Sequence, residues 1–456
     1  MNTIIQQICN EFYSNICKFF ENNDRPDLLT AEKVFFSHVN ETARQLLELH
    51  LNMLEAELYK DKAGRKAERL TVVRRNDGRT VLSKFGELNY RRTYYKDEQK
   101  NSYRYLVDEI AGIEKYQRVS TGVGLELAKA AQDNSYAKSS HQVTGGKVSR
   151  QTVMNRVRES QPVEEEVSGK RHVEVLHVDA DEDHVTMVGG KKSIVPLISV
   201  YEGIERNGKR GKCKNVFHIS EYGKNADELW EQVLSGIERR YDVEDTRIYL
   251  HGDGAAWIER GLEWLPKSKF VLDKYHKNKS IKEMTAGLGQ GVRAGCEKVI
   301  RQALDSGDNE KLLMLSQGLL SENPLRAEKI EAASSYLLKH INGIHICTDD
   351  AEANNGGCTE PHVSHVLSAR LSSRPMKWSK KTLAMLAPML AARGELEPAG
   401  SVQEISALQS RAVAAVRKSF AGKHRLGLPD PAAIGRIPAL SIGKNTPLKQ
   451  AVEIYA

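Results

Sequence analysis

Apolar side chains recur at helical spacing along the first part of the chain. The clearest positions are Ile4, Ile5, Ile8, Phe12, Leu46, Leu47, Leu51, Leu54 and Leu58. Residues three and four apart in sequence share one face of a helix, so this pattern predicts amphipathic helices. We therefore expect a helical N-terminal region over residues 1–70 that contributes packing rather than chemistry.

The pattern changes to alternation after residue 70. Asp77 and Gly78 stand between two runs rich in β-branched residues, within 71–82. An Asp-Gly pair favours the tight turn of a β-hairpin. A tyrosine-rich basic run follows at 86–95, and we expect a small β region over 71–117.

A helix-turn-helix is predicted within residues 118–165. Gly145 and Gly146 interrupt a helical pattern, and Ser149 is well placed to cap the helix that follows. In DNA-binding proteins of this kind, the N-terminal part of the second helix meets base edges. The candidate DNA-binding residues here are Arg150, Gln151, Thr152 and Asn155.

The central part alternates between strand and helix patterns. Strands are predicted at 173–178, 185–188, 194–201, 247–250 and 269–272, with a helix at 226–240. Three antiparallel strands followed by helix, strand, helix and strand suit an RNase H-like α/β domain. We expect its first part over 171–277, an all-α insertion over 278–350, a final helix with a basic segment over 351–394, and a C-terminal tail with a loosely packed helix over 395–456.

Composition narrows the class of protein. The 456 residues carry a net charge of +7, with 40% hydrophobic and 28% charged residues, which predicts two or three domains. No apolar run approaches the roughly 18 residues of a membrane span, and the first residues lack a signal-peptide pattern. The six cysteines are scattered without a CxxC pair. This argues against a structural zinc site and for a cytoplasmic protein with reduced thiols.

Carboxylates gather where two of the predicted strands end. Asp179, Asp181, Glu182 and Asp183 follow the first strand, and Asp253 lies between two glycines after the fourth. The first and fourth strands of an RNase H-like sheet are neighbours, so acids at their ends converge. Such carboxylates hold divalent cations for phosphoryl transfer. Asp179 and Asp181 point to one face of the strand, and either can be the ligand.

A third carboxylate is predicted at Glu360, near the start of a helix that Thr359 can cap. Basic residues follow it, and 361–394 contains no Asp or Glu. An acid-free basic segment suggests a polyanionic partner. We expect Arg370, Arg374 and Lys377 to neutralise DNA phosphates.

Nine short motifs, in order along residues 70–380, carry a resemblance to a known family. They are FGEL (85–88), YRRTYY (90–95), SRQTV (149–153), DADEDHV (179–185), YEG (201–203), GDGAAWI (252–258), LDKYH (272–276), SHVLS (364–368) and RLSSRPMKW (370–378). On these motifs the chain resembles the ISLre-type bacterial insertion-sequence transposases, which were once catalogued as an uncharacterised protein family.

The resemblance implies a DDE transposase with an RNase H-like core and a helical insertion before the final Glu. It implies Mg²⁺, or Mn²⁺ in its place, held by Asp181, Asp253 and Glu360, with Asp181 preferred to Asp179. Asp273 and His276 would line the site. The implied partners are the terminal inverted repeats and target DNA, bound by a homo-oligomer in the cytoplasm at the nucleoid.

Two other functions stand beside this expectation. The chain can be a catalytically silent, DNA-binding regulator derived from a transposase. It can also be a glycosyltransferase whose Asp-x-Asp metal site is Asp179 and Asp181. The second alternative gives no role to Asp253, Glu360, the helix-turn-helix or the basic segment, and ranks lowest.

Overall fold

The computed structural model describes residues 2–165, 167, 169–208, 210–400 and 405–421. The chain is a mixed α/β protein that forms two compact units. Unit 1 comprises the described residues of Met1–Val123 and Val402–Ala456, and unit 2 those of Gly124–Ser401. In the described part of the chain, no helix combines the length and the apolar character needed to cross a membrane.

Unit 1 begins with the predicted helices. They are α1 (Asn2–Glu21), α2 (Leu28–Lys60) and α3 (Lys62–Ala67). Asp27 caps α2 by accepting a hydrogen bond of 2.9 Å from the Thr30 backbone amide. The second half of α2 buries Leu51, Leu54 and Leu58, three of the residues whose spacing predicted the helix. The helical character of this region is confirmed.

A three-stranded antiparallel sheet follows, and its hairpin turn lies in a different place from the predicted one. The strands are β1 (Leu70–Ser83), β2 (Gly86–Asp97) and β3 (Ser102–Arg104). The prediction of a turn at Asp77 and Gly78 was wrong, because β1 continues through both residues as an irregular strand. The Asp77 carboxylate instead accepts hydrogen bonds from Arg74 and Tyr105. The chain reverses before Gly86, whose φ of 113° is a backbone conformation that glycine adopts without strain.

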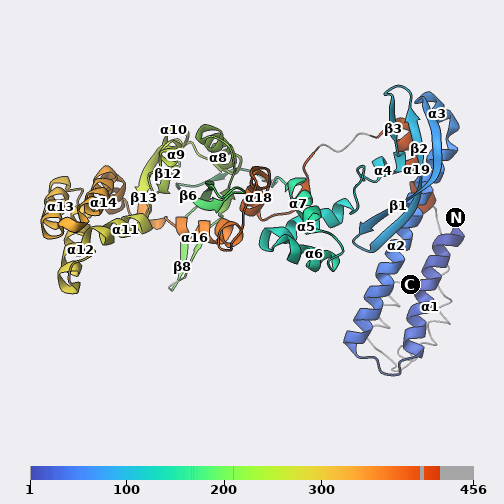
Figure 1. The fold of residues 1–456 in the computed structure, drawn as a ribbon, viewed down its shortest axis with the longest axis horizontal. Helices are drawn as coiled ribbons and strands as arrows, with labels where there is room; N and C mark the ends of the chain where they lie inside the picture. Colours follow the sequence, from blue (N-terminus) through green and yellow to red (C-terminus); the bar gives the residue numbers. More distant parts are fainter. Residues whose placement is uncertain (1, 166, 168, 209, 401–404, 422–456) are drawn as a thin grey trace. The chain divides into compact units, whose positions relative to one another are not determined.

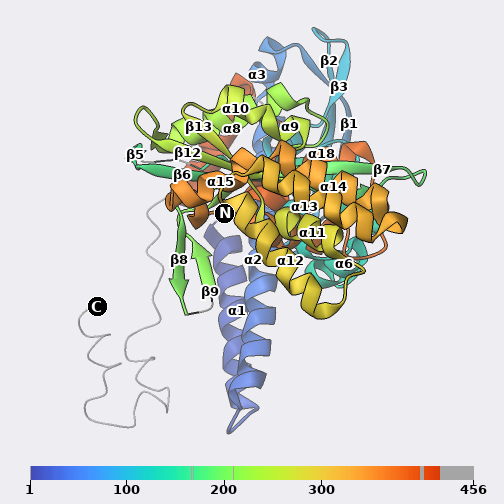
Figure 2. The ribbon, with the colours of Figure 1, turned by 90° about the vertical axis from the view of Figure 1, so that its left-hand side faces the viewer.

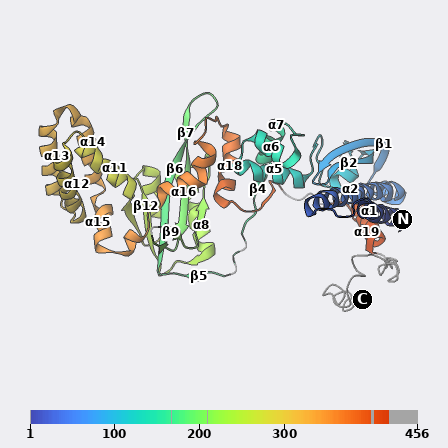
Figure 3. The ribbon, with the colours of Figure 1, turned by 90° about the horizontal axis from the view of Figure 1, so that it is seen from below.

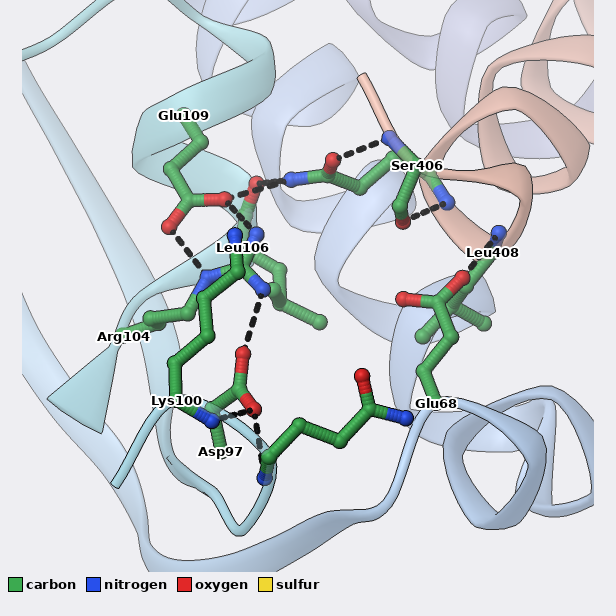
Figure 4. Close-up of polar contacts among 10 residues, drawn as sticks. Glu68, Asp97, Lys100, Arg104, Leu106, Glu109, Ser406 and Leu408 are labelled. Atoms are coloured by element: carbon green, nitrogen blue, oxygen red, sulfur yellow. Dashed lines mark hydrogen bonds and ion pairs between the residues drawn. The ribbon is translucent and has the colours of Figure 1, made fainter. Parts of the chain in front are cut away.

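The C-terminal helix α19 (Ala407–Ala421) belongs to unit 1 and is firmly packed, contrary to the expected loose packing. Its buried residues Leu408, Ala412 and Val416 join the core of α2 and β2. The side chain of Gln409 donates a 2.8 Å hydrogen bond to Glu109 in α4 (Leu106–Ile110). Figure 4 shows this network continuing from Glu109 to Arg104. Composition alone did not reveal these partners, because Gln409 and Glu109 are 300 residues apart in sequence.

Unit 2 contains the predicted pair of helices around a glycine turn. The pair is α6 (Tyr136–Thr144) and α7 (Arg150–Arg158), and α5 (Thr121–Asp133) precedes it. Helix α6 ends at Gly145, whose φ is 62°, and Ser149 caps α7 by accepting from the Thr152 amide at 3.2 Å. The helices, the glycine break and the serine cap therefore agree with the sequence pattern.

The central sheet of unit 2 has five strands in the order β10-β7-β6-β12-β13. Their bounds are β6 (Val175–Thr186), β7 (Lys192–Tyr201), β10 (Phe217–Ile219), β12 (Arg247–Gly252) and β13 (Ser268–Leu272). Strands β10, β7 and β6 are antiparallel to one another, and β6, β12 and β13 are parallel. The first two predicted strands are one continuous strand, β6, so the acids lie within it and not in a turn.

Helices cover both faces of this sheet. Helix α8 (Ala226–Arg240), found over the predicted residues, packs Leu229, Trp230, Val233 and Ile237 against β6, β7 and β12. The short helices α9 (Ala256–Glu259) and α10 (Gly261–Trp264) lie on the same side, and α16 (Thr359–Val363) lies on the opposite side of the sheet in Figure 1. Helix α16 runs on into η3 (Ser364–Ser368) and α17 (Ala369–Leu371), and α18 (Lys380–Ala392) follows.

The segment predicted as all-α contains helices only. They are α11 (Lys274–Thr285), α12 (Gln290–Asp305), α13 (Asn309–Glu322), η1 (Pro324–Arg326), α14 (Ala327–Lys339) and α15 (Ile341–Asp349), followed by η2 (Glu352–Asn355). They share an apolar core that includes Ile300, Leu312 and Leu337. Figure 3 shows them gathered beside the β12 and β13 edge of the sheet.

Three small strand pairs complete unit 2. Strands β4 (Ser160–Pro162) and β14 (Leu396–Pro398) are antiparallel, and β5 (Arg171–His172) and β11 (Tyr241–Asp242) are parallel. Strands β8 (Ile204–Asn207) and β9 (Arg210–Cys213) form a separate antiparallel hairpin between β7 and β10, which Figure 2 shows as two arrows outside the central sheet.

Candidate metal centre

Strand β6 separates its acidic residues onto two faces. Successive side chains of a strand point to opposite sides, so His177, Asp179, Asp181 and Asp183 share one face. Glu182 points the other way, toward α9, where its carboxylate accepts a 2.6 Å hydrogen bond from the indole of Trp257. Glu182 is thereby removed from the cluster that the sequence suggested.

Asp179 is buried and accepts hydrogen bonds from neighbouring donors. It is 2% exposed and accepts hydrogen bonds from the Tyr201 hydroxyl at 3.0 Å and from the Cys358 backbone amide at 2.7 Å. The Nδ1 atom of His362 lies 3.5 Å from the same carboxylate. Through these contacts Asp179 ties Tyr201 and the start of α16 to β6.

Asp183 is also held by the fold. Its Oδ1 atom accepts hydrogen bonds from the hydroxyls of Ser368, at 2.9 Å, and Ser372, at 2.7 Å. Both serines follow the helix that begins at α16. Asp179 and Asp183 thus fasten this helical stretch to β6 on either side of Asp181.

Asp181 differs from its neighbours because it faces other charged residues. The pKa of Asp181 is raised to about 7, mainly by burial and also by the negative charges of Glu360 and Asp253, whereas the Glu182 amide and His276 act to lower it. Glu360 and Asp253, which the sequence also singled out, therefore both act electrostatically on Asp181. The three residues come from α16, the end of β12 and β6.

Asp253 is positioned by the chain reversal after β12. Its Oδ1 atom accepts a hydrogen bond of 2.9 Å from the Ala255 amide, and its backbone carbonyl accepts one of 2.6 Å from the Tyr336 hydroxyl. Gly254 has a φ of 82°, and a Cβ there would lie 2.2 Å from the ring of His340. The glycine therefore permits both an unusual backbone and close packing against α14.

Glu360 is exposed on the first turn of α16, with both residues before it anchored. The Cys358 amide donates to Asp179, and the Thr359 hydroxyl donates to Asp273. Thr359 was expected to cap the helix, but the preceding residue, Cys358, occupies that position and makes no side-chain cap. The helical stretch after Glu360 buries the apolar side chains of Val363, Val366, Leu367 and Leu371.

Asp273 and His276 form the wall of the site at the start of α11. Asp273 caps the helix by accepting from the amides of Tyr275, at 2.8 Å, and His276, at 3.2 Å. Burial alone would raise the pKa of Asp273, but hydrogen bonds from His276 and Thr359 outweigh it and lower the pKa. The pKa of His276 is raised by its Asp273 hydrogen bond and by the charges of Asp253 and Asp181. A protonated His276 would face the carboxylates.

The donor chemistry of the site fits a hard divalent cation. Asp181, Asp253 and Glu360 offer oxygen ligands, and their mutual repulsion is what a cation would relieve. Among the described residues, however, no group of three or more His, Cys, Asp or Glu side chains has the arrangement of a metal site. The ligands are therefore close enough to interact but are not preassembled.

The residues expected to contact DNA divide into exposed and buried sets. Arg150, Gln151, Arg374 and Lys377 are exposed, whereas Thr152 and Asn155 are half-buried. Arg370 is 4% exposed, and its guanidinium donates a 2.7 Å hydrogen bond to the Ala131 carbonyl. The expectation that Arg370 neutralises a phosphate was wrong, because the side chain is consumed in joining the stretch after α16 to α5.

Four residues around the site escaped the sequence analysis. Tyr201 and His362 surround Asp179, and Tyr336 and His340 surround Asp253 and Gly254. Each lies at least 22 residues away in sequence from the residue that it contacts, as the Tyr201–Asp179 pair illustrates. Tyr201 opens the YEG motif and was the only one of the four with a signal in the sequence.

Comparison with known proteins supplies a family. The model of the Uncharacterised protein family (UPF0236) matches residues 28–404. The chain belongs to UPF0236. Two UPF0236 proteins of Caldanaerobacter subterraneus subsp. tengcongensis are 34% and 33% identical to it over 417 residues, covering 89% of this chain and 86% of each relative. A UPF0236 protein in the vanSb 3′ region of Streptococcus gallolyticus is 27% identical over 66% of this chain and 72% of its own length.

The UPF0236 match spans most of the features described above. Residues 28–404 include the helix pair α6 and α7, all five strands of the central sheet and the three converging carboxylates. The same comparison shows that UPF0236 proteins occur in several copies in one genome, since the name of one Caldanaerobacter relative joins eleven loci.

Proposed function

We propose that this UPF0236 protein is a DDE-type transposase that cuts and joins DNA at the ends of an insertion sequence. The observation that carries the proposal is that Asp181, a half-buried acid of β6, is acted on by the negative charges of Asp253, just after β12, and of Glu360 in α16. The strand order β10-β7-β6-β12-β13, with three antiparallel and then two parallel strands, supports an RNase H-like core.

Asp181, Asp253 and Glu360 would hold Mg²⁺, with Mn²⁺ as a substitute. When bound, such cations activate the attacking oxygen and stabilise the leaving oxygen of a phosphodiester. Other residues of the chain hold these carboxylates in position. Asp179 and Asp273 anchor Cys358 and Thr359, the two residues before Glu360, and so fix where its carboxylate starts. His276, held by Asp273, would place a positive charge beside the substrate phosphate.

DNA binding would use two surfaces of unit 2. Helix α7 presents Arg150 and Gln151 to solvent at its N-terminal end, as a recognition helix requires. The exposed Arg374 and Lys377 follow the Glu360 helix and would neutralise phosphates near the site. Two inverted repeats present two equivalent ends, so we propose that the chain acts on DNA as a homo-oligomer.

Multiple copies in one genome support a mobile element. The Caldanaerobacter relatives carry names that join eleven and four loci. A gene that mobilises its own DNA accumulates copies of this kind. The second candidate, a catalytically silent DNA-binding regulator, is favoured by one observation, the lack of a preassembled metal group among the described residues.

A cleavage assay decides between the two candidates. The substrate is a labelled duplex spanning DNA that flanks the coding sequence, and its control is a shuffled duplex of equal length. With Mg²⁺ or Mn²⁺ the wild type should nick or cut the flanking duplex, and Asp253→Ala should not. Asp245→Asn, at the exposed opposite end of β12, is the matched control and should cut normally. If the wild type binds the duplex but never cuts it, the transposase proposal fails and the regulator replaces it.

A further inference from the structure

The hairpin β8–β9 is a feature of unit 2 that neither the sheet nor the candidate metal centre uses. It leaves the central sheet after β7 and returns before β10, and its strands pair only with each other. None of its described side chains is buried. A two-stranded hairpin without an apolar face contributes little to stability, so its retention needs another reason.

The hairpin is strongly basic. Residues 204–214 contain five basic residues and a single acid, Glu205; the basic residues are Arg206, Lys209, Arg210, Lys212 and Lys214. Lys214 lies 3.6 Å from Glu205. Arg206 and Lys212 are exposed. The positive charges of Arg206 and Lys212 are therefore presented to solvent.

The base of the hairpin is attached to the helix that carries Glu360. The Sγ atom of Cys213, the last residue of β9, lies 3.6 Å from Nε2 of His362 in α16. Figure 1 shows β8 projecting from the α16 side of the sheet. Whatever binds the hairpin is thus held close to the site.

Positive charge also lies beside the segment that leads into α16. Lys274, at the start of α11, donates hydrogen bonds to the carbonyls of Asn354, at 2.8 Å, and Gly356, at 3.2 Å, just before α16. Burial lowers the pKa of Lys274, and the positive charges of Arg206 and Lys277 lower it further. These cations repel one another, and a polyanion lying across them would remove that repulsion.

We propose that the β8–β9 hairpin is a DNA-binding arm, whose exposed cations contact the phosphates of the duplex next to the candidate metal centre. An extended two-stranded ribbon fits a DNA groove, and cations along it add phosphate contacts. The tip carries no large apolar side chain, which disfavours insertion into a membrane. This inference rests on the proposed function for the identity of the polyanion.

Salt-dependent binding tests the arm without requiring catalysis. The full chain is titrated with a labelled, mixed-sequence linear duplex of about 30 base pairs, long enough for several phosphate contacts, in EDTA and at several salt concentrations. The variant is Arg206→Gln with Lys212→Gln. The control is Lys298→Gln with Lys329→Gln, which removes the same charge from exposed positions on α12 and α14.

If the hairpin is a DNA-binding arm, loss of its cations should change both the DNA affinity and its dependence on salt. The hairpin variant should bind roughly tenfold more weakly near 0.1 M salt, and its slope of log affinity against log salt should be about 2 units shallower, at close to one unit for each lost phosphate contact. The control should match the wild type. Equal affinity and slope for the hairpin variant and the wild type would overturn the arm and leave the proposed function standing.

The remaining outcomes separate the two proposals. If the hairpin variant loses binding but the wild type never cuts DNA with Mg²⁺ or Mn²⁺, the arm stands and the transposase activity fails. If the wild type binds no duplex at all, both are overturned. Melting temperatures of the variants, which should equal that of the wild type, show that the exposed substitutions leave the fold intact.

Discussion

Two regions on the same polar face of the central sheet differ in what surrounds their carboxylates. In the closed region, Asp179 accepts hydrogen bonds from the Tyr201 hydroxyl and the Cys358 amide, and His362 lies beside it. In the open region, two residues further along β6, the negative charges of Asp253 and Glu360 act on Asp181. The difference teaches that the surrounding donors and charges, not residue type, separate a structural acid from a candidate ligand.

The largest predicted effect is on the open region. Glu360→Gln keeps the size of the side chain but removes its charge, so it should lower DNA cleavage about a thousandfold, the equivalent of several kcal/mol of transition-state stabilisation. Single-turnover cleavage of the flanking duplex measures it. Glu352→Gln, an exposed acid in η2, should cut at the wild-type rate. Cleavage by Glu360→Gln at the wild-type rate would remove Glu360 from the site.

The closed region should respond through stability. Asp179→Asn places an amide against the buried Tyr201 and Cys358 donors, and we expect a loss of about 3 kcal/mol in the free energy of unfolding of unit 2. Denaturant unfolding measures this loss. Glu174→Gln, an exposed acid just before β6, should change stability by less than about 0.5 kcal/mol. Equal stability of Asp179→Asn and the wild type would mean that Asp179 does not anchor α16.

The contribution of Asp181, in the open region, to stability should decrease as the pH rises. The folded-state pKa of Asp181 is about 7, above its ordinary value of 3.8, so the folded chain retains the proton more tightly. Its contribution to stability is therefore largest below about pH 4 and is lost as the pH rises toward 7. Asp181→Asn should be more stable than the wild type at pH 8 by about 2 kcal/mol, with the difference vanishing near pH 4. A variant less stable than the wild type at pH 8 would contradict this assignment.

The smallest predicted effect is on DNA binding by the exposed Arg374 of the basic segment, compared with the buried Arg370. Arg374→Gln should lower the slope of DNA affinity against salt by about 1 unit and leave the melting temperature unchanged. Arg370→Gln should instead destabilise unit 2 by about 2 kcal/mol, because it leaves the Ala131 carbonyl without its buried donor. Reversed outcomes for the two arginines would invalidate the distinction.

Elements with an apolar face could be predicted from the sequence. Helix α8 was expected at its observed residues because Leu229, Trp230, Val233 and Ile237 follow helical spacing. Strand β6 was divided in two because its middle is acidic. The pattern does not reveal that buried acids are satisfied by donors distant in sequence, such as Cys358 for Asp179. For the same reason, the packing of α19 through Gln409 was missed.

The candidate site was predicted in part. Asp253 and Glu360 both act electrostatically on Asp181, as the selection of these three residues expected, although Asp181 lies within β6 and Glu360 lies in α16. Asp179 could not be separated from Asp181, because both lie on one face and only the surrounding donors distinguish them. Arg370 was misassigned because its charge is visible in the sequence and its burial is not.

The central claim is that Asp181 holds a divalent cation, and calorimetric titration with Mn²⁺ at pH 8 tests it most directly. Asp181→Asn is compared with Glu182→Gln, its neighbour on the opposite face of β6. We predict that the wild type and Glu182→Gln bind Mn²⁺ alike and that Asp181→Asn binds at least about tenfold more weakly, since it lacks one anionic ligand. Unchanged Mn²⁺ affinity in Asp181→Asn, or no binding by the wild type, would contradict the claim.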